Sequence, residues 1–285
     1  MITSFRSFEG KESVNTAIQN QFLRSVKDCS KAFDLELIVV QYQEKFVKSN
    51  LKNLSLNYRF VSLGKEIPFY RYSLSEILST GFRMATGEII IYSTCDVVIT
   101  PLLLLDIQNS MPTNGVVIPY PYPESVFGFE EPIKIQPEKN FESGLDIFAF
   151  SMKAKDTFMD FDFLTKHKLL GWGMFDHLIV VGCIQLGIKI TKISAMLSTQ
   201  KFENDRSQNS ETSLWLTTCH AYNVNQFRKY VGLNLKLLSL LTLKGLHSAL
   251  NLNGKVKFNY LNKFSLILIR DQVSFLFRNI RLFLS

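Results

Sequence analysis

Regular alternation of strand-like and helix-like segments over residues 1–100 is the feature that most constrains the fold. Leu35–Gln41 and Glu88–Ser93 are β-branched apolar runs, of the kind that parallel sheets bury on both faces. Val14–Cys29 and Leu74–Ala85, which lie before these runs, carry apolar residues at helical spacing. Strands that alternate with helices predict a parallel sheet with right-handed crossovers. The expected class is therefore α/β, with a Rossmann-like, mostly parallel sheet flanked by helices.

Further segments extend this pattern. Thr86-Gly87 is expected to end the second helix, because glycine readily takes the left-handed conformation after a helix. The Pro-rich stretch from Tyr120 to Pro137 predicts an ordered functional loop. The other expected strands are Ile2–Ser7, Tyr58–Leu63, Gly115–Pro119, Leu145–Ser151 and Lys189–Leu197. The other expected helices are Leu102–Ser110, Lys153–Phe158 and one that begins within Gly171–Gly187.

The charges divide the chain into two parts. Residues 228–285 hold ten of the 32 Lys and Arg and one of the 25 acidic residues, so residues 1–227 hold 22 basic and 24 acidic side chains. The apolar fraction of 46% excludes a disordered chain, and 24 Phe residues predict an aromatic core. We expect a globular domain over residues 1–227 and a basic tail over residues 228–285.

The tail predicts an amphipathic basic helix. Its apolar residues recur at three- and four-residue spacing, at Leu266, Ile269, Val273, Leu276, Phe277, Ile280 and Leu284. Such a helix suits an anionic membrane surface. The alternative is packing on its own domain or on a second subunit. Nucleic acid is not expected as a partner, because the apolar face favours a membrane or a protein.

Cysteine usage and hydropathy predict the compartment. Cys29, Cys95, Cys183 and Cys219 are widely spaced, which excludes a zinc-ligand pattern and favours reduced thiols. The first residues lack the apolar run of a signal peptide, and no stretch is long and apolar enough to span a membrane. The expectation is a cytoplasmic protein, peripheral on the inner face of the membrane.

Two motifs resemble a known family. Ser79–Glu88, followed by an apolar strand and Thr94-Cys95-Asp96, is similar to the family-2-like GT-A glycosyltransferases, in which a helix ending in Ala-x-Gly-Glu precedes a strand and an Asp-x-Asp motif. Further along, Gly171-Trp172-Gly173-Met174-Phe175-Asp176 resembles the Gly-Trp-Gly-x-Glu-Asp segment of inverting galactosyltransferases. The resemblance covers roughly residues 1–200.

The resemblance implies the GT-A fold and a reaction. A sugar would pass from a nucleoside diphosphate sugar to a hydroxyl of a glycan or lipid-linked acceptor, with inversion, in surface polysaccharide synthesis. Asp176 matches the catalytic base. The donor-binding residues it implies are Ser4, Arg6, Gln41, Thr94, Cys95 and Asp96. The acceptor-binding residues are Tyr120, Tyr122, Trp172 and Gly173; the flat ring of Trp172 suits a sugar.

Three departures from the family pattern leave alternatives open. Thr94 replaces the first Asp of the Asp-x-Asp motif, so Asp96 is the remaining candidate ligand for Mn²⁺ or Mg²⁺, and a metal-independent site is the alternative. Gln41 stands near the place where relatives hold the nucleobase with an Asp. Phe175 replaces the Glu before the base.

A non-catalytic sugar- or nucleotide-binding member of the fold is one rival function, and a nucleotidyltransferase is another. Asp146, in an apolar strand, is either acceptor-binding or an exposed edge residue.

Overall fold

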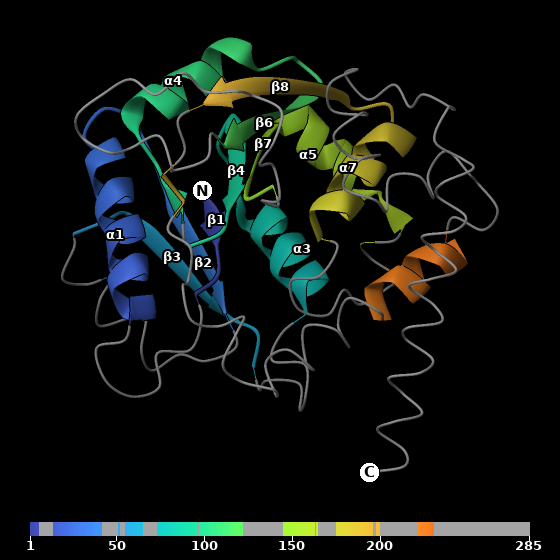
Figure 1. Ribbon diagram of the computed structural model, residues 1–285, viewed down its shortest axis with the longest axis horizontal. Helices are drawn as coiled ribbons and strands as arrows, with labels where there is room; N and C mark the ends of the chain where they lie inside the picture. Colours follow the sequence, from blue (N-terminus) through green and yellow to red (C-terminus); the bar gives the residue numbers. More distant parts are fainter. Residues whose placement is uncertain are drawn as a thin grey trace, which may run out of the picture.

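A seven-stranded mixed sheet forms the centre of the molecule (Figure 1). The computed structural model describes residues 1–5, 14–41, 51, 55–64, 73–95, 97–121, 145–162, 164, 175–195, 198–199 and 222–230. The strand order is β3-β2-β1-β4-β7-β6-β8. In that order the strands are Tyr58–Ser62, Leu37–Gln41, Ile2–Thr3, Ile89–Ser93, Ile147–Ser151, Gly115–Pro121 and Lys189–Ala195.

Strand direction agrees with the predicted class. β1 pairs in parallel with β2 and β4, β2 with β3, and β6 with β8. β7 runs antiparallel to both its neighbours, β4 and β6. The sheet is therefore mostly parallel, and the α/β prediction is confirmed.

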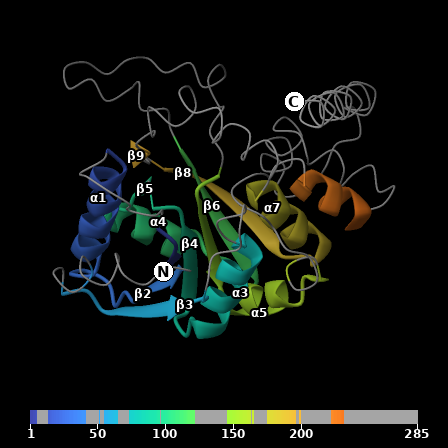
Figure 2. The ribbon, with the colours of Figure 1, turned by 90° about the horizontal axis from the view of Figure 1, so that it is seen from below.

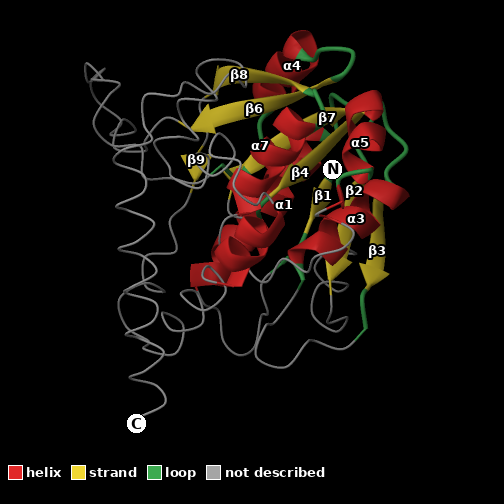
Figure 3. Ribbon diagram, turned by 90° about the vertical axis from the view of Figure 1, so that its right-hand side faces the viewer, coloured by secondary structure: helices red, strands yellow, loops and turns green. Residues whose placement is uncertain are grey.

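Helices cover both faces of this sheet (Figure 2, Figure 3). α1 (Val14–Cys29) and α4 (Pro101–Ser110) lie on one face. α3 (Leu74–Met84), α5 (Met152–Met159) and α7 (Phe175–Gln185) lie on the other. Successive strand residues point to opposite faces, so β2 contributes Ile38 and Val40 to the core on the α3, α5 and α7 face, and its other apolar residues to the core on the α1 and α4 face. The result is two apolar cores separated by one sheet.

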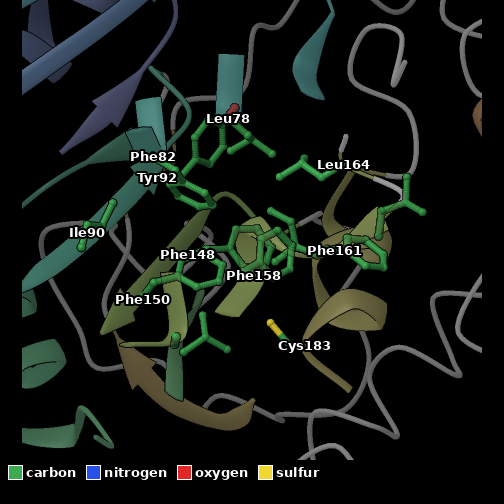
Figure 4. Close-up of a cluster of buried hydrophobic side chains, with 14 of the residues drawn as sticks. Leu78, Phe82, Ile90, Tyr92, Phe148, Phe150, Phe158, Phe161, Leu164 and Cys183 are labelled. Atoms are coloured by element: carbon green, nitrogen blue, oxygen red, sulfur yellow. The ribbon is translucent and has the colours of Figure 1, made fainter. Parts of the chain in front are cut away.

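Aromatic side chains fill the core on the α3, α5 and α7 face (Figure 4). The ring of Phe150 lies 5.2 Å from those of Phe82 and Phe158, centroid to centroid. Phe161 extends the cluster to Tyr230, whose ring is 5.6 Å away. Phe227 is fully buried in the same core. The helix over residues 222–230 therefore packs on the main domain and runs across the predicted boundary between residues 227 and 228.

Helix α3 and strand β4 contain the first motif, which includes two glycines. The structure shows why glycine is needed at one of these positions and overturns the predicted conformation of the other. A Cβ on Gly81 would lie 2.5 Å from Cγ2 of Ile2, so only glycine lets α3 approach β1 this closely. The prediction that Gly87 takes a left-handed conformation is wrong. The helix ends at Met84 because Ala85 turns into extended backbone, with φ −77° and ψ 129°. Positive φ among the described glycines occurs at Gly64 and Gly187.

A second, two-stranded sheet was not predicted. β5 (Val97–Val98) pairs antiparallel with β9 (Ser198–Thr199) (Figure 2). The pairing brings the chain that follows β4 to the chain that follows β8.

The predicted loop beyond Pro121 and the tail beyond Tyr230 lie outside the described residues. Within the described part of the chain, no helix has the length and apolar character needed to cross a membrane.

Candidate functional site

Four of the predicted donor-binding residues lie at the carboxyl ends of adjacent parallel strands. Ser4 follows β1, Gln41 ends β2, and Thr94 and Cys95 follow β4. Their exposed fractions lie between 1% and 7%. The Thr3 hydroxyl donates to the carbonyl oxygen of Ser93 at 2.8 Å, so β1 and β4 are bonded at this level. Because the carboxyl ends of these strands share one edge, the four residues lie along the same edge of the sheet.

Two buried polar atoms at this edge have no hydrogen-bond partner. They are Oε1 of Gln41 and Oγ1 of Thr94, whose side chains are 7% and 3% exposed. Leaving a buried polar atom unpaired costs about 1–3 kcal/mol. Both groups can therefore form a hydrogen bond with a ligand that reaches this edge.

Asp176 lies in the first turn of α7, where the helix dipole favours a negative charge. Its Oδ1 accepts the N–H of His177 at 2.9 Å, and its Oδ2 accepts the N–H of Leu145 at 3.2 Å. The side chain is 13% exposed. Nε2 of the buried His177 lies 3.8 Å from Oδ1, beyond hydrogen-bond distance. Each carboxylate oxygen keeps capacity for a further donor, since an ionised carboxylate offers about four lone-pair sites.

The chain just before β7 connects Asp176 to the carboxyl end of β4. Leu145 donates its N–H to Asp176, and the carbonyl oxygen of Asp146 accepts the N–H of Thr94 at 3.0 Å. Leu145 therefore contacts the motif that contains Asp176, and the next residue, Asp146, contacts the motif that contains Thr94. The predicted base and the predicted donor residue Thr94 therefore lie at the same edge of the sheet, although they are far apart in the sequence.

The loop after Cys95 is held by α1. The N–H of Ile99 donates to Oγ of Ser25 at 3.0 Å, and the thiol of Cys29 donates to the carbonyl oxygen of Ile99 at 3.5 Å. Cys95 and Val97, which flank position 96, are both buried. The chain is thus anchored on both sides of the motif.

The other predicted site residues lie outside the described side chains. Tyr120 is described only as backbone of β6. Those with no described structure are Arg6, Asp96, Tyr122, Trp172 and Gly173. Among the residues that the structure describes, no group of three or more His, Cys, Asp or Glu could hold a metal ion. These residues alone do not fit a metal site, and no chemical step is assigned to a metal here.

The comparisons with known proteins concern the fold. No protein-family model and no curated protein sequence matches the chain. Glucosyl-3-phosphoglycerate synthase from Mycobacterium tuberculosis, solved with Mn²⁺, uridine diphosphate and phosphoglyceric acid, is similar over 81% of this chain and 77% of its own, with 14% identity and a TM-score of 0.51. The chain has the GT-A fold.

A second structure of related architecture comes from Anaerococcus prevotii. It is 4-diphosphocytidyl-2C-methyl-D-erythritol synthase, similar over 78% of this chain and 97% of its own, with 15% identity and a TM-score of 0.46. A fold does not by itself determine a function; the side chains at the site do.

For Asp146, the sequence left two roles open, an acceptor-binding residue or an exposed edge residue. It is half-buried and lies opposite Thr94, at the edge where the GT-A sheet gathers the predicted donor residues. An acidic residue within an apolar strand was the available signal. Its position became clear only through the antiparallel register of β7 against β4.

Proposed function

We propose that this protein is a glycosyltransferase that moves a sugar from a nucleoside diphosphate sugar to a hydroxyl of a glycan or lipid-linked acceptor, with inversion. The observation that supports the proposal is that the two sequence motifs are hydrogen-bonded to consecutive residues, Leu145 and Asp146. The carboxylate of Asp176 accepts the N–H of Leu145, and the next residue pairs with Thr94. A carboxylate at the same sheet edge as buried, unpaired polar groups is suited to a transfer reaction.

In this proposal the reaction is a single displacement. The acceptor oxygen forms a bond to the anomeric carbon of the sugar while the bond from that carbon to the diphosphate oxygen breaks. The acceptor proton passes to Asp176, and the nucleoside diphosphate leaves with the bonding electrons. Backbone N–H groups on both oxygens hold the carboxylate in one orientation, which supports a role that needs fixed geometry.

The donor side is proposed from the strand ends. Ser4, Gln41, Thr94 and Cys95 line the edge, and the unpaired Gln41 Oε1 and Thr94 Oγ1 support hydrogen bonds to the nucleotide sugar. Gln41 could hold the base edge, since its amide both donates and accepts. Arg6 and Asp96 complete the proposed donor set, with Asp96 toward the diphosphate or a divalent metal.

The acceptor side and the membrane contact are proposals from the sequence. Tyr120, Tyr122, Trp172 and Gly173 would line the acceptor site, with the Trp172 ring stacked on a sugar. The basic tail over residues 228–285 would hold the protein on the inner face of the membrane, near lipid-linked acceptors of surface polysaccharide synthesis.

The test combines binding with turnover. We expect one nucleotide and its sugar derivative, among a panel assayed with and without Mn²⁺, to raise the melting temperature of the protein. At about 100 times its dissociation constant, such a ligand adds about 2.7 kcal/mol to the free energy of unfolding.

The variant Asp176→Asn should then lose transfer by a factor of about 100 or more while retaining donor binding, because an amide cannot take the acceptor proton. Asp160→Asn, an exposed carboxylate that follows α5, is the matched control and should leave turnover unchanged. Unchanged turnover in Asp176→Asn would remove the base assignment. Binding without transfer by the unmodified protein would favour the non-catalytic alternative.

A further inference from the structure

Asp146 and Thr94 lie directly opposite each other at the edge of the sheet. The Thr94 N–H donates to the Asp146 carbonyl oxygen at 3.0 Å, which continues the antiparallel register of β4 and β7 one pair beyond Ser93 and Ile147. Residues directly opposite on antiparallel strands project from the same face of the sheet, with Cβ atoms about 5 Å apart. The side chains of Asp146 and Thr94 therefore project from the same face of the sheet at its carboxyl edge.

The two side chains differ in their access to solvent. Thr94 is 3% exposed, and its Oγ1 has no hydrogen-bond partner. Asp146 is half-buried, so part of the residue is accessible from solvent. A hydroxyl that both donates and accepts, beside a carboxylate that accepts, forms a small polar site.

The chemistry of this pair selects one part of a nucleotide sugar. A diphosphate is anionic, and a carboxylate repels it unless a cation lies between them. Sugar hydroxyls are neutral and can donate to a carboxylate while accepting from a threonine hydroxyl. The site therefore fits the sugar better than the diphosphate.

We infer that Asp146, together with Thr94, binds hydroxyl groups of the sugar that is transferred. Asp176 lies next to this site, because the residue that precedes Asp146 donates its N–H to the Asp176 carboxylate. A sugar held at Asp146 is thus beside the proposed base. The inference rests on the proposed function and assigns Asp146 a role in sugar recognition.

The test separates binding of the sugar from binding of the nucleotide. Dissociation constants are measured by calorimetry for two probe pairs, UDP with UDP-glucose and GDP with GDP-mannose, with the unmodified protein and Asp146→Asn. For the pair that binds, Asp146→Asn should weaken the nucleotide sugar on the order of tenfold to a hundredfold, since a charged hydrogen bond is lost. Its affinity for the free nucleotide should not change.

A control and a second variant complete the design. Asp34→Asn removes an exposed carboxylate in the turn before β2 and should affect neither ligand. Asp146→Glu keeps the charge and moves the carboxylate by one methylene. It should also weaken the nucleotide sugar and spare the nucleotide, which keeps the test available if Asp146→Asn does not fold.

Three results would overturn the inference. Equal weakening of nucleotide and nucleotide sugar would place Asp146 at the diphosphate or at a metal. Unchanged binding of both would remove Asp146 from the site while leaving the proposed function standing. Failure of the unmodified protein to bind either pair, or any nucleotide of the thermal-stability panel, would overturn the proposed function itself, and the inference with it.

Discussion

Single residues at the carboxyl edge show a conflict between stability and binding. Thr3 and Thr94 are both buried and lie on neighbouring strands. The Thr3 hydroxyl donates to the carbonyl oxygen of Ser93, whereas Oγ1 of Thr94 has no partner. A buried polar atom without a partner destabilises the folded state, and under the proposed function a bound donor would supply the partner that Oγ1 of Thr94 lacks.

This difference predicts opposite effects of the same substitution. Thr94→Val removes an unpaired hydroxyl and keeps the shape, so we expect it to raise the free energy of unfolding by about 1 kcal/mol. Donor binding should weaken in the same variant. Thr3→Val removes a paired hydroxyl and leaves the Ser93 carbonyl unsatisfied, so stability should fall by about 1 kcal/mol. Urea denaturation of the two variants checks both signs; a loss of stability in Thr94→Val would contradict the argument.

The side chains of the site were predictable only in part. Apolar runs predicted where β2 and β4 end, and the family resemblance named Ser4, Gln41 and Thr94 as donor-binding residues. The strand predicted over Ile2–Ser7 ends at Thr3, so Ser4 follows it rather than lying within it. The link from Asp176 to Thr94 was not predictable. It depends on Leu145 and the antiparallel register of β7, a pairing between distant segments that local sequence does not specify.

At the scale of elements, local periodicity predicted the long helices and strands well. α1 has the expected bounds, and α3, α4 and β3 differ from expectation by one residue at one end. β5 and β9 have two residues each and exist through pairing with one another, so no periodicity could reveal them. The prediction that Gly87 ends α3 in a left-handed conformation was wrong. The helix ends because Ala85 has extended backbone angles, and Gly87 does not have a positive φ.

The two motif glycines therefore have different physical roles, and alanine distinguishes them. Gly81→Ala should destabilise the protein by about 1–3 kcal/mol, because its Cβ would lie 2.5 Å from Ile2 Cγ2 and would push α3 away from β1. Gly87→Ala should be nearly neutral, since its Cβ would meet only the Ile89 carbonyl oxygen at 3.7 Å. Thermal unfolding of the pair is the measurement. Equal destabilisation would show that the close approach of α3 to β1 is not what requires Gly81.

At the scale of the whole molecule, the two cores enclose three cysteine thiols. Cys29 and Cys95 belong to the core under α1 and α4, and Cys183 belongs to the aromatic core. All three are buried, and none of them forms a disulfide within the described part of the chain. The stability of both cores therefore depends on thiols that remain protonated and uncharged.

This dependence predicts a loss of stability at high pH. Burial, assisted by the Asp28 carboxylate, raises the pKa of the Cys29 thiol to about 11, and burial also raises the pKa of Cys183. An unfolded thiol titrates near pH 8.5, so above that pH the unfolded chain releases protons that the folded chain retains. The stabilisation is complete below about pH 8.5 and is lost as the pH rises toward 11, by up to about 1.4 kcal/mol per pH unit for each thiol.

A double variant distinguishes the contribution of the thiols to the pH dependence of stability from that of the Lys and Tyr residues, which titrate in the same pH range. Cys29→Ala/Cys183→Ala should be less stable than the unmodified protein at pH 7.5, because it creates two cavities. The difference between the two proteins should shrink on going to pH 10, since only the unmodified protein loses the thiol contribution. Urea denaturation at both pH values measures it. Parallel pH profiles would show that these thiols keep their ordinary pKa in the folded state, and that their surroundings are more hydrated than the two packed cores indicate.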